Sequence, residues 1–166
     1  MSSNTSTSTW PAQRRIGMAE AAVLIFLDID GVLRRIGSPL DVLDADCLGR
    51  FEAVLRAHPA ARIVISSSWR LVYGLDAIRA RFAPDIGARI IGHTPWLEDR
   101  RQASRADEVL AYLASFAETP RWVALDDQSE VYADRGLADC VIPLDGEMGF
   151  DGVAAARLGA VLGRRV

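Results

Sequence analysis

Lysine is missing from this chain, and the overall charge shows no excess of basic residues. All 19 basic residues among the 166 are arginine, and the net charge is −3. A global positive field that would draw the protein to nucleic acid or to a membrane is therefore excluded, although a local basic groove is not. Any step that needs a cationic side chain must use arginine, which stays charged and can bind a phosphate through two N–H groups.

Cysteine is scarce, and long apolar runs are absent. The two cysteines, Cys47 and Cys140, do not form a CxxC pair, and we expect both thiols to be reduced and buried. No apolar stretch reaches the roughly 20 residues that cross a bilayer. The Ser/Thr-rich beginning of the chain lacks the hydrophobic region of a secretory signal. We therefore expect a cytoplasmic protein with no membrane partner.

Length and patterning indicate one folded domain after a polar leader. Residues 1–20 are expected to be flexible, and residues 21–166 are long enough for a single domain with a sizeable core. Short apolar segments, typical of strands, alternate with amphipathic segments, typical of helices. The expected strands span 22–28, 62–68, 88–92, 121–127 and 139–145, and the expected helices span 44–58, 74–83, 104–117, 128–135 and 152–163. This alternation predicts an α/β fold in which helices cover both faces of a parallel sheet.

The most informative segment is 23–33, an apolar run that leads into two aspartates and a glycine. Asp28 and Asp30 are spaced i, i+2, which puts them on the same side of the chain at the end of a buried strand. Gly31 permits a sharp turn directly after them. Carboxylates in such a position are costly unless a cation or a reaction requires them. The spacing therefore predicts a functional site at the end of the first strand.

Two further expected strands also end in polar residues. Residues 66–68 are three serines, and Asp126 and Asp127 end the strand at 121–127. Ligands of parallel sheets bind outside the carboxyl ends of the strands, so these side chains are expected to converge with Asp28 and Asp30. Four carboxylates at close range would repel one another, and their hard oxygen atoms suit Mg²⁺.

In their order along the chain, these segments resemble the motifs of the haloacid dehalogenase (HAD) superfamily of phosphohydrolases. Residues 26–33 (FLDIDGVL) resemble the first motif, residues 63–70 (IVISSSWR) the second and residues 124–127 (ALDD) the fourth. The SSSWR segment, the R-x-x-E-V start of the helix at 104–117 and the ALDD strand end also resemble the HAD domains of Swiss-army-knife RNA repair proteins. The resemblance implies a three-layer, Rossmann-like HAD core with five parallel strands in the order 5-4-1-2-3.

By this resemblance, Asp28 is the nucleophile that forms an aspartyl-phosphate. Asp30 protonates the leaving oxygen and then activates the hydrolytic water. Ser66 binds the transferring phosphoryl group, and Arg105 balances its charge in place of the usual lysine. Arg101 is the second candidate for the basic residue of the third motif.

The resemblance also implies a set of metal ligands. The expected Mg²⁺ ligands are Asp28, Asp30 through its backbone carbonyl, Asp126 and Asp127, the last through water or as an orienting residue. The candidate substrate-binding residues are Ser67, Arg70 and Arg101. For Arg70, a surface ion pair is an equal alternative. Trp69 is expected to be a core residue rather than a platform for base stacking.

The segments at 31–61 and 69–104 are too short to hold the large cap domain of many family members. An open site favours a large substrate, such as a nucleic-acid end, or closure by another subunit, which leaves oligomerisation open. Residues 93–102 are a candidate for a modest lid.

The leading hypothesis is therefore a Mg²⁺-dependent phosphomonoesterase that acts on a nucleotide or a nucleic-acid-end phosphate. The alternative is a non-catalytic HAD-like module that binds a metal or phosphate and has a regulatory role. A response-regulator receiver domain also clusters aspartates, but it normally needs a lysine after its last strand, and this chain contains none.

Overall fold

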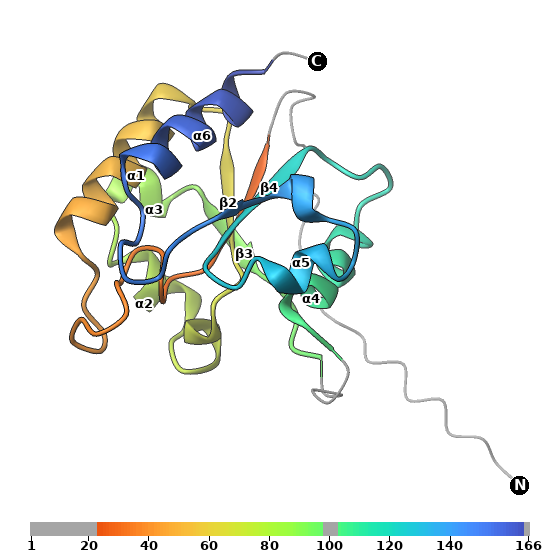
Figure 1. The fold of residues 1–166 in the computed structure, drawn as a ribbon, viewed down its shortest axis with the longest axis horizontal. Helices are drawn as coiled ribbons and strands as arrows, with labels where there is room; N and C mark the ends of the chain where they lie inside the picture. The colour runs from red at the N-terminus through yellow and green to blue at the C-terminus, as the bar shows by residue number, and fades with distance from the viewer. Residues whose placement is uncertain (1–22, 98–102, 165–166) are drawn as a thin grey trace, which may run out of the picture.

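A five-stranded parallel sheet forms the centre of the molecule (Figure 1). The structure, a computed structural model, describes residues 23–97 and 103–164. The strands are β1 (Leu24–Leu27), β2 (Arg62–Ile65), β3 (Ile90–His93), β4 (Trp122–Asp126) and β5 (Val141–Pro143). Their order is β3-β2-β1-β4-β5, which confirms the predicted α/β fold and strand order.

Helices cover both faces of the sheet. One layer contains α1 (Ala45–Ala57), α2 (Leu75–Arg79), α3 (Pro84–Gly87) and α6 (Gly152–Gly163), and the other contains α4 (Arg105–Leu113) and α5 (Glu130–Ala133). Two short 3₁₀ helices, η1 (Ser68–Leu71) and η2 (Ala138–Cys140), follow β2 and precede β5. Figure 1 shows α1 beside α6 on one side of the strands and α4 beside α5 on the other. Within the described residues, no inserted domain covers the carboxyl edge of the sheet, and no helix is long and apolar enough to cross a membrane.

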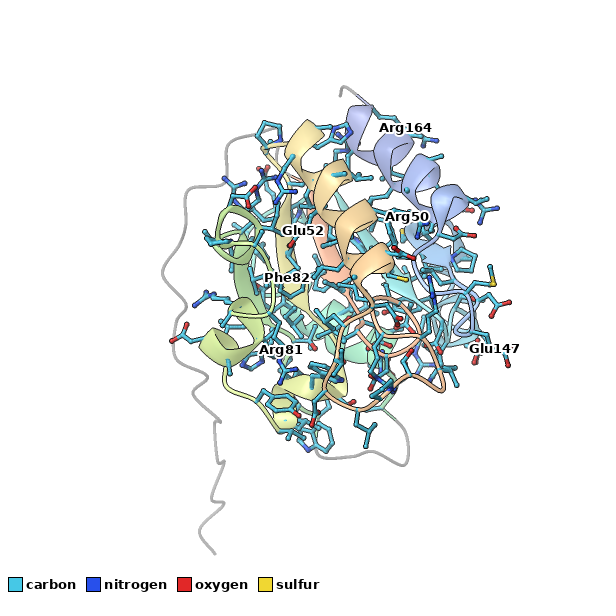
Figure 2. All side chains as sticks on the ribbon, turned by 90° about the vertical axis from the view of Figure 1, so that its left-hand side faces the viewer. Arg50, Glu52, Arg81, Phe82, Glu147 and Arg164 are labelled. Carbon is cyan, nitrogen blue, oxygen red and sulfur yellow. The ribbon has the colours of Figure 1, made fainter. Side chains whose placement is uncertain are left out.

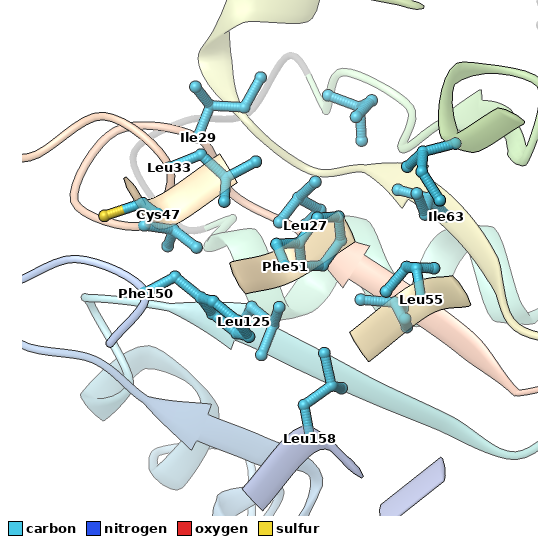
Figure 3. Close-up of a cluster of buried hydrophobic side chains, with 14 of the residues drawn as sticks. Leu27, Ile29, Leu33, Cys47, Phe51, Leu55, Ile63, Leu125, Phe150 and Leu158 are labelled. Atoms are coloured by element: carbon cyan, nitrogen blue, oxygen red, sulfur yellow. The ribbon is translucent and has the colours of Figure 1, made fainter. Parts of the chain in front are cut away.

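The central strand β1 is buried on both faces. Ile25 and Leu27 face the α1–α6 layer, and Leu24 and Phe26 face the α4–α5 layer, because successive side chains of a strand point to opposite faces. In Figure 3, Phe51 of α1 lies beside Leu27, and Leu158 of α6 lies farther away in the same core, toward Leu125. The alternation continues past the end of β1, so Asp28 falls on the α4–α5 face.

Several element boundaries differ from the sequence-based expectation. The strand expected at 62–68 ends at Ile65, and the serines that follow it form a turn into η1. The single helix expected at 74–83 ends at Arg79, and the structure adds the separate helix α3. Pro84 explains this division, because proline starts a helix readily and keeps the preceding residue, Ala83, extended. Residues 152–163 form a helix as predicted.

Ion pairs tie the α1 layer together. Arg56 Nε donates to Asp85 Oδ2 at 2.8 Å, and Glu52 Oε1 accepts the backbone N–H of Ala83 at 2.7 Å. Figure 2 shows this layer from outside, with Glu52 pointing toward the α2–α3 segment and Arg50 on the exposed surface. Arg56 thus stabilises the fold, in contrast to Arg105, described next.

Candidate active site

The register of the sheet lines up four polar residues at its carboxyl edge. Asp28, Ser66 and Thr94 directly follow β1, β2 and β3, and Asp126 is the last residue of β4. The strand partners before them are in register, and the N–H groups of Asp28, Ser66 and Thr94 bond to neighbouring strands at 3.1, 3.0 and 2.9 Å. The four residues therefore form a row across the sheet on the face covered by α4 and α5.

An acidic cluster lies in the middle of this row. Asp28 is 3% exposed and Asp126 is 0% exposed. One carboxylate oxygen from each of Asp28, Asp126 and Asp127 lies within 4.8 Å of the others. A Cβ atom at Gly31 would lie 2.4 Å from Asp127 Oδ2, and one at Gly146 would lie 2.9 Å from it, so both glycines are needed to make room for this carboxylate. A compact set of hard oxygen donors fits a divalent cation such as Mg²⁺.

Arg105 is the cation that the structure brings to these carboxylates. Its Nη1 atom contacts Asp28 Oδ2 and lies 3.3 Å from Asp126 Oδ2. Arg105 is the first residue of α4, where a capping box fixes the helix start: Ser104 and Asp107 exchange hydrogen bonds between side chain and backbone. The two residues that cap α4 therefore also position Arg105, the basic residue of the site.

Burial and charge shift the pKa values of the cluster. Burial raises the pKa of Asp28 to about 6, against the opposing effect of Arg105 and with a smaller contribution from Asp126. Burial is also the main cause of the raised pKa values of Asp126 and Asp127. For Arg105, burial alone would lower the pKa, but the carboxylates of Asp28 and Asp126 outweigh it and raise the pKa above its usual value. One guanidinium thus leaves the cluster with excess negative charge, which a divalent cation would relieve.

Two buried hydroxyl groups lie next to the cluster. Ser66 Oγ and Thr94 Oγ1 are fully buried and have no hydrogen-bond partner among the described residues. Such groups are rare in folded proteins and often mark a place for a ligand or water. Thr94 was not among the residues singled out from the sequence. Thr94 is recognised as part of the row only from the structure, because it directly follows β3 and lies opposite Ser66 in the strand register.

Arg70 connects the end of β2 to α4. Its Nη1 atom donates to the carbonyl oxygens of Ser66 and Ser67 at 2.9 and 2.7 Å, and its Nη2 atom donates to Glu108 Oε2 at 2.6 Å. The side chains of Arg70 and Glu108 are 4% and 10% exposed, so this is a largely buried ion pair. Ser67 is fully buried and accepts the backbone N–H of Trp69. The structure thus places Arg70 and Ser67 where they hold the serine turn beside Arg105.

Asp30 lies on the other side of the site. Its Oδ1 atom accepts hydrogen bonds from Arg34 Nε at 2.5 Å and Trp69 Nε1 at 3.0 Å. Its side chain is 39% exposed and does not belong to the acidic cluster. Asp28 and Asp30 therefore face different partners, although the strand spacing had suggested one side. Trp69 is buried, as expected of a core residue, but its ring N–H reaches the site.

A cavity of about 200 Å³ opens beside Arg105. Its walls include Ser68, Glu108 and Gln128, together with the apolar side chains of Leu97 and Val131. This cavity lies between η1 and the starts of α4 and α5, next to the row of polar residues. Arg101 and the leader at 1–20 lie outside the described residues, as does the second half of the candidate lid, residues 98–102.

One family model covers most of the chain. The model described as the HAD domain in Swiss Army Knife RNA repair proteins matches residues 24–155, which include Asp28, Ser66, Arg105, Asp126 and Asp127. No curated protein and no solved structure matches the chain.

Proposed function

Because the chain belongs to the family of HAD domains in Swiss Army Knife RNA repair proteins, we propose that it is a Mg²⁺-dependent phosphomonoesterase that works through an aspartyl-phosphate on Asp28. The observation that carries this proposal is the position of Asp28: it lies in the polar row between Ser66 and Asp126 and in contact with Arg105. A nucleophile, a hydroxyl donor and a cation within one row are what phosphoryl transfer to a carboxylate requires.

In the first step, a carboxylate oxygen of Asp28 attacks the phosphorus atom. The bond between phosphorus and the leaving oxygen breaks, its electron pair stays on that oxygen, and Asp30 donates a proton to it. Ser66 would donate its unpartnered hydroxyl to a phosphoryl oxygen, and Arg105 would balance the charge of the transferring group.

In the second step, Asp30 removes a proton from a water molecule, and the oxygen of that water attacks the phosphorus atom. The bond to Asp28 breaks, and its electron pair restores the carboxylate. The products are inorganic phosphate and an alcohol, and every catalytic group returns to its starting state.

Asp28, Asp126 and Asp127 would hold the Mg²⁺ ion, and the backbone carbonyl of Asp30 would complete the protein ligands. A bound Mg²⁺ supplies positive charge that lowers the repulsion between an anionic substrate and an anionic nucleophile. Asp126 also accepts hydrogen bonds from the backbone of Gln128 at 2.9 Å and from the hydroxyl of Tyr132 at 3.2 Å, which fix the orientation of its carboxylate.

For the substrate, we infer a phosphate carried by a nucleotide or by a nucleic-acid end. The name of the family model supports this choice, and so does the absence of an inserted domain over the site within the described residues. A cytoplasmic setting agrees with the two free cysteines, Cys47 and Cys140. Closure of the site by a second subunit is compatible with the same open edge.

The test is hydrolysis of p-nitrophenyl phosphate by purified protein with and without Mg²⁺. We expect Mg²⁺-dependent release of phosphate that Asp28→Asn abolishes, and no change in the control Asp76→Asn, which alters a 95% exposed carboxylate on α2. Activity in Asp28→Asn equal to that of the wild type would overturn the proposal. Mg²⁺ binding without turnover on a broad set of phosphate esters would favour the alternative, a non-catalytic binding module.

A further inference from the structure

We propose that Trp69 and Arg34 are positioning residues for Asp30 and fix the direction in which its free carboxyl oxygen faces the leaving group. This inference rests on the proposed function, because it names the residues that orient the proposed acid–base group. It concerns the side chain of Asp30, which is not part of the acidic cluster of Asp28, Asp126 and Asp127.

The two donors converge on one oxygen atom. Arg34 Nε lies 2.5 Å and Trp69 Nε1 lies 3.0 Å from Asp30 Oδ1. Within residues 23–97 and 103–164, Oδ2 of the same carboxyl group accepts no hydrogen bond. Two N–H donors on Oδ1 fix the plane of the carboxyl group, so Oδ2 is the oxygen left open toward a substrate. The carboxyl group is thereby fixed with one oxygen anchored and the other free to act as acid and base.

Arg34 is held by the turn that follows the first motif. Its backbone N–H donates to the carbonyl of Ile29 at 2.9 Å, and its carbonyl accepts the N–H of Gly31 at 2.7 Å. Its Nη1 atom donates to the carbonyl of Ser38 at 2.9 Å, and its side chain is only 12% exposed. The guanidinium therefore has a fixed position beside Asp30.

Trp69, in η1, is held from the opposite direction by residues on either side of α2. Its ring packs against Tyr73 with centroids 5.3 Å apart, and the guanidinium of Arg81 lies 4.8 Å from the Trp69 ring centroid. Arg81 is labelled in Figure 2, at the lower end of the helical layer that faces the viewer. Cation–π contact and ring packing together fix the direction in which the indole N–H points.

A purely structural role would also explain a buried tryptophan. Trp69 is 6% exposed, and a buried indole usually finds some acceptor for its N–H. Here, however, the acceptor is the carboxylate two residues from the nucleophile, and a second donor from a separate turn meets the same oxygen. A structural role and a positioning role differ in one measurable consequence, the dependence of the rate on the leaving group.

Proton donation matters most when the leaving oxygen is a strong base. A p-nitrophenolate departs without a proton, whereas an alkoxide from an alkyl phosphate does not. Loss of packing should slow both reactions equally. Loss of alignment at Asp30 should slow the alkyl ester more.

The experiment compares kcat for p-nitrophenyl phosphate and glycerol 2-phosphate in Trp69→Phe, which keeps a ring but removes the N–H donor. We expect a loss of about tenfold on glycerol 2-phosphate and about twofold on p-nitrophenyl phosphate. The matched control is Trp122→Phe, the same change in the first residue of β4, at the end of that strand away from the site. The Trp122 ring packs against Phe26, with ring centroids 5.6 Å apart. The ratio of the two rates in this control should equal that of the wild type.

A second variant tests the same prediction in case Trp69→Phe disturbs folding. Arg34→Met removes the other donor, and it should change the same ratio in the same direction, with circular dichroism and melting temperature confirming the folded state of each variant. Equal losses on the two esters, or no loss, would overturn the positioning role alone. If the wild-type protein cleaves neither ester, the proposed function fails and this inference falls with it.

Discussion

Asp28 and Asp30 lie two residues apart in the chain, yet their side chains belong to different regions of the molecule. On the α4 side, Asp28 is buried beside Arg105 and Asp126, and the groups around it are charged. On the η1 side, Asp30 is partly exposed and is anchored by donors from Arg34 and Trp69. The first region concentrates opposite charges where solvent screens them weakly, and the second holds one carboxyl group in a fixed orientation.

Under the proposed function, this difference lets one short motif supply two chemical roles. A nucleophile for an anionic substrate needs positive charge close to it, which Arg105 provides and a divalent cation would complete. An acid–base group needs access to solvent and a defined direction, which partial exposure and two anchoring donors provide. The backbone turn at Gly31, with a φ of 77°, follows both aspartates and brings Arg34 back beside Asp30.

The sharpest way to break the comparison is to neutralise each aspartate in turn. Asp28→Asn should lower kcat by at least about 10⁴-fold on any phosphate ester, because the nucleophile is lost. Asp30→Asn should cost about 10²- to 10³-fold on an alkyl phosphate and clearly less on p-nitrophenyl phosphate. Steady-state kinetics on the two esters measures both effects. If the two variants showed the same dependence on the leaving group, the division of roles would be wrong.

The next largest effect is expected from the cation of the α4 side. Arg105→Met should reduce kcat/KM by about 10²- to 10³-fold on both esters, because charge in the transition state loses its partner. The control is Arg135→Met, which removes an exposed arginine that pairs with Asp107, a residue of the same helix as Arg105. Its kcat/KM should stay within about twofold of the wild-type value. Activity of Arg105→Met within tenfold of the wild type would show that the guanidinium does not balance the transferring group.

Much of this arrangement could be predicted from the sequence, and the reasons are local. The strand ends at Asp28, Ser66 and Asp126 follow from apolar runs that end in polar residues, and a parallel sheet brings such ends together. The start of α4 at Arg105 follows from the Ser104–Asp107 capping box. Each of these features depends on a few neighbouring residues.

What the sequence did not reveal depends on contacts between distant segments. The bond from Trp69 to Asp30 spans 39 residues, and the ion pair of Arg70 with Glu108 spans 38 residues. Thr94 joins the row only through the register of β2 with β3, in which an irregularity between Ile63 and Val64 shifts the pairing. The hydrophobic pattern indicates which face of a strand a residue occupies, but it does not indicate which distant side chain that residue contacts.

The buried carboxylate of Asp28 also predicts that the stability of the protein depends on pH. In the metal-free protein, the pKa of Asp28 is about 6, above the ordinary value of 3.8, so folding favours the protonated form. The stabilisation is present below pH 4 and is lost as the pH rises through about 6. Asp28→Asn should therefore be more stable than the wild type at pH 8, by about 3 kcal/mol, and about equally stable near pH 4.

Urea unfolding in the presence of a chelator measures this difference. Added Mg²⁺ should then raise the stability of the wild type and have less effect on Asp28→Asn, because ligand binding to the folded state adds stability. A variant that is less stable than the wild type at pH 8 would show that the contact with Arg105 outweighs the cost of burial.

The smallest effect is expected at the edge of the row. Thr94→Val removes a buried hydroxyl that has no partner among the described residues, so the free energy of unfolding should stay the same or rise by up to about 1 kcal/mol. Thermal unfolding compares this variant with Thr94→Ala, which also leaves a small void. A clear loss of stability in Thr94→Val would mean that the hydroxyl holds a buried water or another partner.

The central claim is that Asp28 carries the phosphoryl group during turnover. Rapid acid quenching of the wild-type protein with Mg²⁺ and a phosphate ester, followed by mass spectrometry of the intact chain and its peptides, tests it most directly. The mechanism predicts a mass increase of one phosphoryl group, located at Asp28, removed by hydroxylamine and absent from Asp28→Asn. Steady release of phosphate with no phosphorylated chain under single-turnover conditions, or a phosphoryl group on another residue, would contradict it.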